Sequence, residues 1–154
     1  MPVSENLAIF LAEYLIYFSV LVIPYLLLKG KTHDLLRIAV SVIVAFTVSE
    51  LIKYATAVPR PFVAGEFEPL ISLSPRDFYG SFPSGHATFM GALAMALFFR
   101  DKAAGAVAFT AGLLVGWGRV LVGIHYPLDI AAGLVLGAVV STFFKYVHDK
   151  SPIW

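Results

Sequence analysis

Five apolar stretches follow one another along the chain, and short polar segments separate them. A helix needs roughly 20 mostly apolar residues to cross a bilayer, and most of these stretches come near that length. The pattern predicts an all-α, polytopic membrane helical bundle with about five transmembrane helices. No repeat or linker interrupts it, so we expect residues 1–154 to form a single integral membrane domain. The stretches are 7–28, 35–52, 86–99, 103–121 and 128–147.

Two of the stretches depart from a plain spanning helix. The 14 residues of 86–99 reach only about 21 Å, so we expect this helix to begin a turn earlier or to lie off-centre in the bilayer. In the stretch 7–28, Pro24 is expected to kink the helix. No Lys or Arg precedes that stretch and no clear cleavage site follows it, so we expect a retained anchor rather than a signal peptide.

Glycines recur at helical spacing in the last two stretches. Gly112 and Gly116 are four residues apart, as are Gly133 and Gly137. Small residues at this spacing let helices approach closely in lipid. We therefore expect these glycines to lie at helix–helix contacts.

The composition makes a bilayer the expected solvent. Apolar residues make up 59% of the 154-residue chain and charged residues 14%, whereas a soluble domain is nearer half apolar and about a quarter charged. The mean hydropathy is +0.84, and a soluble domain of this size has too little interior for so much apolar side chain. These values argue against a soluble globule, a disordered chain and a nucleic-acid binder. The lack of Cys excludes disulfides, thiolate zinc sites and a Cys nucleophile.

The distribution of Lys and Arg predicts an orientation in the plasma (inner) membrane. With five spans, one set of helix ends carries seven of these residues and the other set carries four. Positively charged loops stay on the cytoplasmic side, so the C-terminus should be cytoplasmic and the N-terminus should face out. The richer set is Lys29, Lys31, Arg37, Arg100, Lys102, Lys145 and Lys150, and the poorer set is Lys53, Arg60, Arg76 and Arg119.

Three polar stretches lie where predicted spans meet the outer surface. They are 53–61 (KYATAVPRP), 82–86 (FPSGH) and 119–129 (RVLVGIHYPLD). Charged groups at that depth cost several kcal/mol or more without a partner or water. We therefore expect the three stretches to meet in one polar pocket.

The residue types in this pocket suit the binding of a phosphate dianion. Lys53, Arg60 and Arg119 supply the charge, because Arg offers planar bidentate donors and Lys a compact cation. Ser84 and Gly85 open the third span, where the free N–H groups of a helix start bind anions and Gly permits close backbone approach. Taken alone, Ser84 would be only a helix cap and Lys53 a snorkelling anchor.

Two imidazoles and a carboxylate complete the predicted pocket. His86 and His125 can supply a nucleophile and an acid. Asp129 follows His125 by four residues, in the first turn of a span that Pro127 can begin. From there Asp129 can hold one ring nitrogen of His125 and leave the other free to attack. Each residue alone has an ordinary structural explanation, but their combination on one side of the bundle favours a catalytic site.

These motifs resemble the three-part signature of the type 2 phosphatidic acid phosphatase superfamily. Its members carry Lys-x6-Arg-Pro, then Pro-Ser-Gly-His, then Ser-Arg-x5-His-x3-Asp. The sequence matches these parts at Lys53, Arg60 and Pro61, at 83–86, and at Arg119, His125 and Asp129.

The resemblance implies a membrane lipid phosphatase that needs no metal or cofactor and forms a phosphohistidine. It implies that His125 attacks phosphorus, that Asp129 orients His125, and that His86 protonates the leaving oxygen and then activates water. The carboxylates are also too scattered along the sequence for a two-metal site. The residues expected to bind the phosphate are Lys53, Arg60, Ser84, Gly85 and Arg119.

Within the superfamily, the sequence is most similar to bacterial undecaprenyl-diphosphate phosphatases of the bacitracin-resistance type. The similarity lies in 60–64 (RPFVA), 81–88 (SFPSGHAT) and the Glu-Tyr pair at 13–14. It implies removal of the terminal phosphate of undecaprenyl diphosphate at the outer membrane face. Two positions differ, since many of this subgroup have Asp where Gly85 stands, and the superfamily usually has a phosphate-binding Ser where Gly118 stands. We expect one hydrogen bond to be lost at Gly118 without loss of activity.

Other functions remain open at this point. The same superfamily resemblance allows a phosphatase for phosphatidic acid, phosphatidylglycerol phosphate or lipid A. A protein that binds or translocates phosphate lipids without catalysis is a different class, but pure binding would need only the cations. A small channel is disfavoured, because no span is lined with polar residues throughout. The oligomeric state and the preferred chain length are not indicated.

Three further features have no assigned place in this pocket. Glu13 and Glu50 are carboxylates within or at the edge of predicted spans, which makes them functional candidates. Because neither has an evident partner in the sequence, we favour helix-end or packing roles for them. The segment 62–80 either covers the lipid headgroup as a lid or forms a solvated loop.

Overall fold

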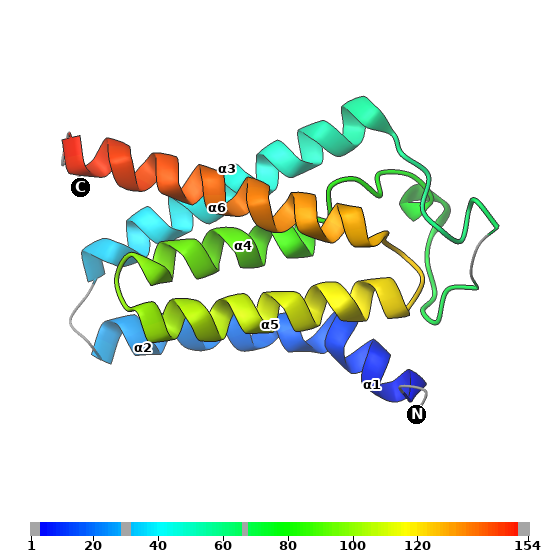
Figure 1. Ribbon diagram of the computed structural model, residues 1–154, viewed down its shortest axis with the longest axis horizontal. Coiled ribbons are helices and arrows are strands. Elements are labelled where there is room, and N and C mark those ends of the chain that lie inside the picture. Colours follow the sequence, from blue (N-terminus) through cyan, green and yellow to red (C-terminus); the bar gives the residue numbers. More distant parts are fainter. Residues whose placement is uncertain (1–3, 29–31, 66–67, 151–154) are drawn as a thin grey trace.

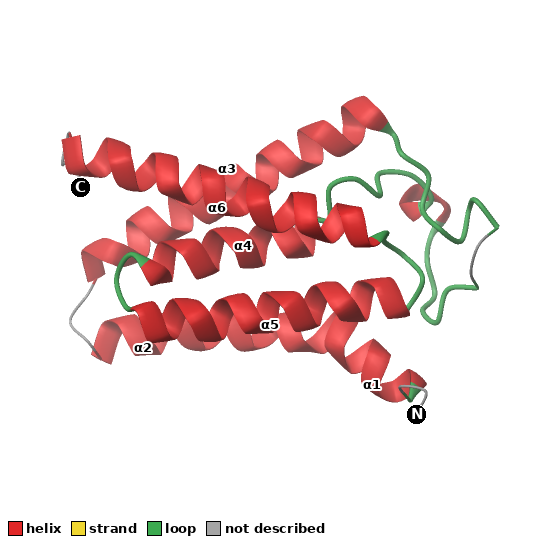
Figure 2. Cartoon of the chain, in the orientation of Figure 1, coloured by secondary structure: helices red, strands yellow, loops and turns green. Residues whose placement is uncertain are grey.

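The computed structural model describes residues 4–28, 32–65 and 68–150, without the side chains of 32–34 and 76. Lys29, Lys31 and the Arg76 side chain, on which the predicted orientation partly rests, lie outside the described residues. Within these ranges every named element is helical (Figure 2). The elements are α1 (Glu5–Ile9), η1 (Phe10–Tyr14), η2 (Leu15–Leu21), α2 (Val22–Leu28), α3 (Thr32–Thr56), η3 (Pro75–Asp77), α4 (Gly85–Phe98), α5 (Lys102–Leu121) and α6 (Pro127–Lys150).

Four helical segments are long and apolar enough to cross a membrane, which confirms the predicted multi-pass helical architecture. They are Glu5–Leu28, Leu35–Thr56, Lys102–Leu121 and Pro127–Lys150. The remaining predicted helix, at 86–99, corresponds to α4, which has 14 residues. Ser84 caps α4 by accepting a hydrogen bond from the Ala87 N–H. The helix therefore begins at Gly85, and the expectation that it begins a whole turn earlier was wrong.

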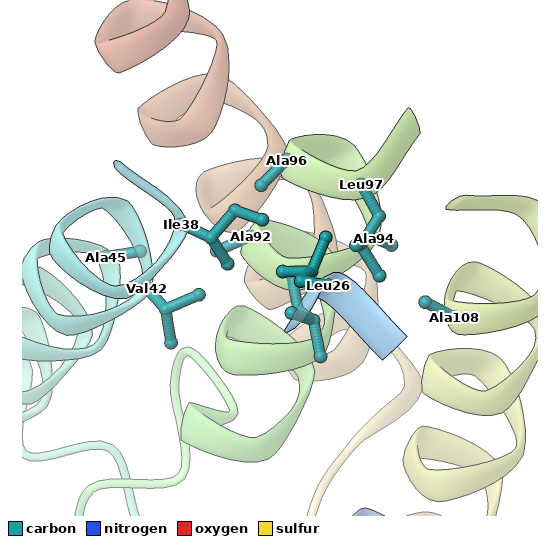
Figure 3. Close-up of a cluster of buried hydrophobic side chains, with 10 residues drawn as sticks. Leu26, Ile38, Val42, Ala45, Ala92, Ala94, Ala96, Leu97 and Ala108 are labelled. Atoms are coloured by element: carbon teal, nitrogen blue, oxygen red, sulfur yellow. The ribbon is translucent and has the colours of Figure 1, made fainter. Parts of the chain in front are cut away.

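The short helix α4 lies at the centre of the bundle, where it packs against α3, α5 and α6. Its alanines leave room for the neighbouring helices, and Ala92, Ala94 and Ala96 are all buried. Figure 3 shows these alanines together with Leu26 and residues of α3 and α5 in one apolar cluster. Small side chains at helix contacts let backbones approach closely in a bilayer.

The predicted glycine contacts are confirmed. A Cβ atom added to Gly137 would lie 2.2 Å from the Thr88 carbonyl oxygen of α4, and one added to Gly133 would lie 2.7 Å from the Ser84 carbonyl oxygen. On α5, a Cβ atom on Gly116 would lie 2.3 Å from a methyl carbon of the Ile130 side chain. The absence of side chains at these positions thus sets the spacing of α4, α5 and α6.

The first span changes helix type along its length. A π-helical turn, η1, occupies Phe10–Tyr14, and its i→i+5 character is seen in the bond that the Leu15 N–H donates to the Phe10 carbonyl. The 3-10 stretch η2 follows and gives way to α2 at Val22, just before Pro24. The π-helical turn therefore lies well before Pro24, the residue that was expected to kink this helix.

The helix ends divide into two groups at opposite ends of the bundle. The C-terminal end of α3, the start of α4, the end of α5 and the start of α6 lie at one end, with the long connection between α3 and α4 beside them (Figure 1). The start of α1 lies at this end too, whereas the end of α6 lies at the other. This arrangement brings the three polar stretches of the sequence to the same end of the protein.

Candidate active site

Each predicted site residue is presented by the end of a helix or by the loop next to it. Lys53 lies in the last turn of α3 and Arg119 in the last turn of α5. His86 is the second residue of α4, and Asp129 lies in the first turn of α6. His125 lies in the short connection between α5 and α6.

Asp129 is the best-connected of these residues. Its Oδ2 atom accepts hydrogen bonds from the Ser81 hydroxyl at 2.5 Å and from the Tyr126 N–H at 2.8 Å. The same oxygen lies 3.4 Å from Nδ1 of His125. His125 and Asp129 are only 2% and 3% exposed, so the pair is withdrawn from solvent.

The Asp129 carboxylate determines which nitrogen of His125 can react. A carboxylate accepts hydrogen bonds, so a neutral His125 carries its proton on Nδ1 and keeps a lone pair on Nε2. An imidazole held in this way is suited to nucleophilic attack through Nε2.

The start of α4 is tied to the start of α6. The backbone N–H of Ser84 donates to the main-chain carbonyl of Asp129 at 3.0 Å. Ser84 is fully buried, and Gly133 lets α6 pass close to its carbonyl. This contact keeps the first turn of α4, including His86, next to the His125–Asp129 pair, and His86 also lies within electrostatic reach of the Arg119 and Lys53 charges.

Two buried arginines present donors that no described residue satisfies. Arg60 is 9% exposed and Arg119 is 8% exposed. The Nη1 atom of Arg60 donates to the Ile124 carbonyl at 3.4 Å, beside His125. The Nε atoms of both arginines are buried and have no hydrogen-bond partner within the described part of the chain. Because a buried, unsatisfied cationic donor is costly, two such donors suit the binding of an oxyanion.

Lys53 reaches the start of α4 because Gly85 has no side chain. A Cβ atom on Gly85 would lie 2.9 Å from the Lys53 ammonium nitrogen. That nitrogen lies 2.5 Å from Glu50 Oε1. Lys53 and Arg60 also line an open polar cavity of about 490 Å³, together with the carboxylates of Glu50 and Asp77.

Both intramembrane glutamates have cationic partners, which the sequence did not reveal. Glu50 pairs with Lys53, and Glu13 lies 2.9 Å from Nη1 of Arg119. The absence of a partner, from which helix-end or packing roles were expected, is therefore contradicted, because each glutamate contacts a predicted phosphate-binding cation.

The described parts of the segment 62–80, which are 62–65 and 68–80, pack against the bundle rather than extending freely into solvent. Phe62, Ile71 and Leu73 contact an apolar cluster that includes Val122 and Ile124. The Leu70 N–H donates to the Val122 carbonyl at 3.1 Å, and the rings of Phe62 and Phe78 meet edge to face. This packing holds the backbone that directly precedes His125.

Gly118 serves a packing contact in this chain. A Cβ atom there would lie 2.5 Å from the Ala12 backbone nitrogen and 2.7 Å from the Leu11 carbonyl carbon. A serine at this position would therefore push against the backbone of the first span. The glycine allows η1 to approach the end of α5 closely.

Several pKa values at this end are shifted by the surroundings. Burial lowers the pKa of His125 to about 4, against an opposing hydrogen bond to Asp129. Burial also lowers the pKa of Arg60, while hydrogen bonds from Ser74 lower the pKa of the Asp77 carboxyl. At neutral pH His125 is therefore an uncharged imidazole beside cations, as a nucleophile requires.

Ser81 was not assigned a role from the sequence. Its hydroxyl is fully buried and donates to Asp129, but a lone serine in a loop gives no signal of such a contact.

Across the described ranges, no group of three or more His, Asp and Glu residues could hold a metal ion.

Comparisons with known proteins show which family and which proteins the chain is similar to. The family model of the PAP2 superfamily matches residues 34–153. The chain is 32% identical over 150 residues to undecaprenyl-diphosphatase BcrC of Bacillus subtilis, covering 96% of this chain and 76% of the relative. It is 31% identical over 152 residues to the undecaprenyl-diphosphatase of Sulfolobus acidocaldarius, covering 97% and 73%.

A third relative and two solved structures are also similar. The lipid A 1-phosphatase of Rhizobium johnstonii is 37% identical over 159 residues, covering 90% of this chain and 64% of the relative. The crystal structure of Aquifex aeolicus LpxE superposes with a TM-score of 0.77 at 20% identity, covering 94% of this chain and 88% of the other. A transmembrane PAP2 type phosphatidylglycerolphosphate phosphatase from Bacillus subtilis superposes with a TM-score of 0.68 at 20% identity, covering 96% and 85%.

The shifted pKa of His125 predicts an imidazole that stays neutral well into the acid range. A histidine in an unfolded chain titrates near pH 6.5, whereas this one has a pKa of about 4 in the folded protein. Nuclear magnetic resonance of ¹⁵N-histidine-labelled protein, assigned with His125→Asn, should show neutral nitrogen shifts for His125 at pH 5.5. A His125 signal with a midpoint near pH 6.5 would contradict the buried pair.

Proposed function

The chain belongs to the PAP2 superfamily and is a membrane lipid phosphatase, and on that premise we propose that it hydrolyses the terminal phosphate of undecaprenyl diphosphate. The observation that carries the mechanism is the buried His125–Asp129 pair within electrostatic reach of two arginines with unsatisfied Nε donors. The substrate is favoured by the relatives named undecaprenyl-diphosphatase, which match more than nine-tenths of the chain.

In the first step, Nε2 of His125 attacks the terminal phosphorus. A P–N bond forms while the bond between phosphorus and the bridging oxygen breaks, and undecaprenyl phosphate leaves. His86 donates a proton to that oxygen, and Asp129 stabilises the charge that develops on the His125 ring.

In the second step, water replaces His125 on phosphorus. His86, now without its proton, accepts one from the water as the oxygen attacks. The P–N bond breaks, the electron pair returns to Nε2, and inorganic phosphate is released. Both imidazoles are then back in their starting states, so the cycle needs no metal or cofactor.

The phosphoryl oxygens are bound by cations and by the start of α4. Arg60 and Arg119 offer the unsatisfied Nε donors, and Lys53 offers a point charge near Gly85. The Ser84 hydroxyl and the Gly85 N–H lie at the start of a helix, where anions are stabilised. Preorganised charge of this kind is usually the largest contribution to phosphoryl transfer.

An apolar cavity offers a place for the lipid chain of the substrate. It has a volume of about 300 Å³ and lies between the first span, α4 and α5. Two of its lining residues are Met90, one helical turn after His86, and Leu15, two residues after Glu13. A chain attached to the bound phosphate can therefore enter apolar space one turn below the reacting group.

The site is proposed to face the outer side of the membrane. The catalytic end carries Lys53, Arg60 and Arg119, which the proposed function uses, while the opposite end carries Arg37, Arg100, Lys102 and further Lys residues of α6. Cations that serve catalysis are poor guides to topology, and the remaining excess of Lys and Arg at the opposite end supports a cytoplasmic location for that end.

Phosphate release from a panel of purified lipids is the experiment that tests the proposed substrate. The panel contains undecaprenyl diphosphate, phosphatidic acid, phosphatidylglycerol phosphate and lipid A, each with and without EDTA. We expect the highest kcat/KM with undecaprenyl diphosphate and no effect of EDTA. A higher kcat/KM with another lipid would show that undecaprenyl diphosphate is not the preferred substrate. Activity lost to EDTA and restored by Mg²⁺ would overturn the metal-free mechanism.

Removal of the proposed nucleophile should abolish turnover without unfolding the protein. His125→Ala should lower kcat at least about 1,000-fold, and Asp129→Asn should lower it about 100-fold or more, because the tautomer of His125 is no longer fixed. The matched control is His148→Ala, which removes an imidazole from the last turn of α6. Wild-type turnover in a folded His125→Ala protein would exclude His125 as the nucleophile.

A further inference from the structure

The Arg119 guanidinium is held from the side of the first span. Its Nη1 atom donates to Oε1 of Glu13 at 2.9 Å and to the Ala12 carbonyl at 3.4 Å. Its Nε atom is buried and has no partner in the described part of the chain. One edge of the guanidinium is thus fixed by the first span, while Nε is left for another acceptor.

The local backbone is built to bring Glu13 to this position. Ala12 and Glu13 lie in the π-helical turn η1, and such turns interrupt the regular helical ladder and often occur at functional sites. The turn can approach α5 because position 118 is Gly, where a Cβ atom would lie 2.5 Å from the Ala12 backbone nitrogen. Gly118 therefore allows η1, the segment that contacts Arg119, to lie close to α5.

We propose that Glu13 is a positioning residue for the phosphatase reaction, which orients Arg119 so that its free Nε–H meets a phosphoryl oxygen. This inference rests on the proposed function and adds to it a residue from the first span. The carboxylate makes a charge-assisted hydrogen bond, which is short and directional. Gly118 and Glu13 act together. Gly118 lets the first span approach α5 closely, and this approach allows Glu13 to accept the hydrogen bond from Arg119.

A competing role for Glu13 makes the opposite prediction. If the carboxylate only neutralised Arg119 until an anion displaced it, removing Glu13 would strengthen the binding of phosphate analogues. If Glu13 positions Arg119, removing it weakens that binding and lowers kcat/KM. Inhibition by orthovanadate, a phosphate analogue, separates the two roles.

The experiment compares Glu13→Ala, Glu13→Gln and the matched control Glu5→Ala in the purified full-length chain. Glu5 lies on the same span in the first turn of α1 and is exposed. We expect Glu13→Ala to lower kcat/KM and vanadate affinity by up to about 100-fold. Glu13→Gln should lose only about 5-fold, because its amide oxygen still accepts a weaker hydrogen bond. Glu5→Ala should stay within about 2-fold of wild type.

A double-mutant cycle decides whether Glu13 acts through Arg119. In the Arg119→Ala background, Glu13→Ala should cause almost no further loss of vanadate affinity. An equal loss in both backgrounds, tighter vanadate binding, or a Glu13→Ala protein that matches Glu5→Ala would each overturn the proposal. Vanadate binding measured by calorimetry does not depend on the lipid, so a failure of the proposed substrate is detected separately in the lipid panel.

Discussion

The Asp129 carboxylate ties three separate parts of the chain together at one buried point. It accepts hydrogen bonds from Ser81 and from the Tyr126 N–H, and it lies beside Nδ1 of His125. Its main-chain carbonyl also accepts from Ser84 at the start of α4. A buried carboxylate is tolerated only when its oxygens are satisfied. The loop before α4, the α5–α6 connection and the first turn of α6 therefore have to meet where they do.

The cationic side chains of the site are also held in place by specific hydrogen-bonding partners. Each of two predicted phosphate-binding cations has its own glutamate, Lys53 with Glu50 and Arg119 with Glu13. Arg60 is instead held by the Ile124 carbonyl beside the proposed nucleophile. These partners leave the buried Nε donors of Arg60 and Arg119 without an acceptor in the described part of the chain. An oxyanion bound at the site would accept hydrogen bonds from both.

The membrane helices and the identity of most proposed site residues could be read from the sequence, because both depend on local signals. Apolar stretches of spanning length predicted the helices, and fixed spacings such as that from Arg119 through His125 to Asp129 predicted the pocket. The contact of Glu13 with Arg119 could not be read, because it joins residues far apart in sequence through a π-helical turn. Helix length alone suggested that α4 begins a turn earlier, whereas the local Ser84-Gly85 signal gave the start that the structure has, because the Ser84 side chain caps the helix. The role of Gly118 became visible only with the backbone of the first span beside it.

In the proposed mechanism, a phosphoryl group passes through Nε2 of His125. The most direct measurement is rapid alkaline quench of the enzyme with undecaprenyl diphosphate labelled in its terminal phosphate, followed by mass spectrometry of the peptide that contains His125. This mechanism predicts a base-stable, acid-labile phosphoryl group on His125 during turnover, absent from His125→Ala. Rapid turnover with no label on His125 at any quench time, under conditions in which a phosphohistidine standard survives, would contradict it.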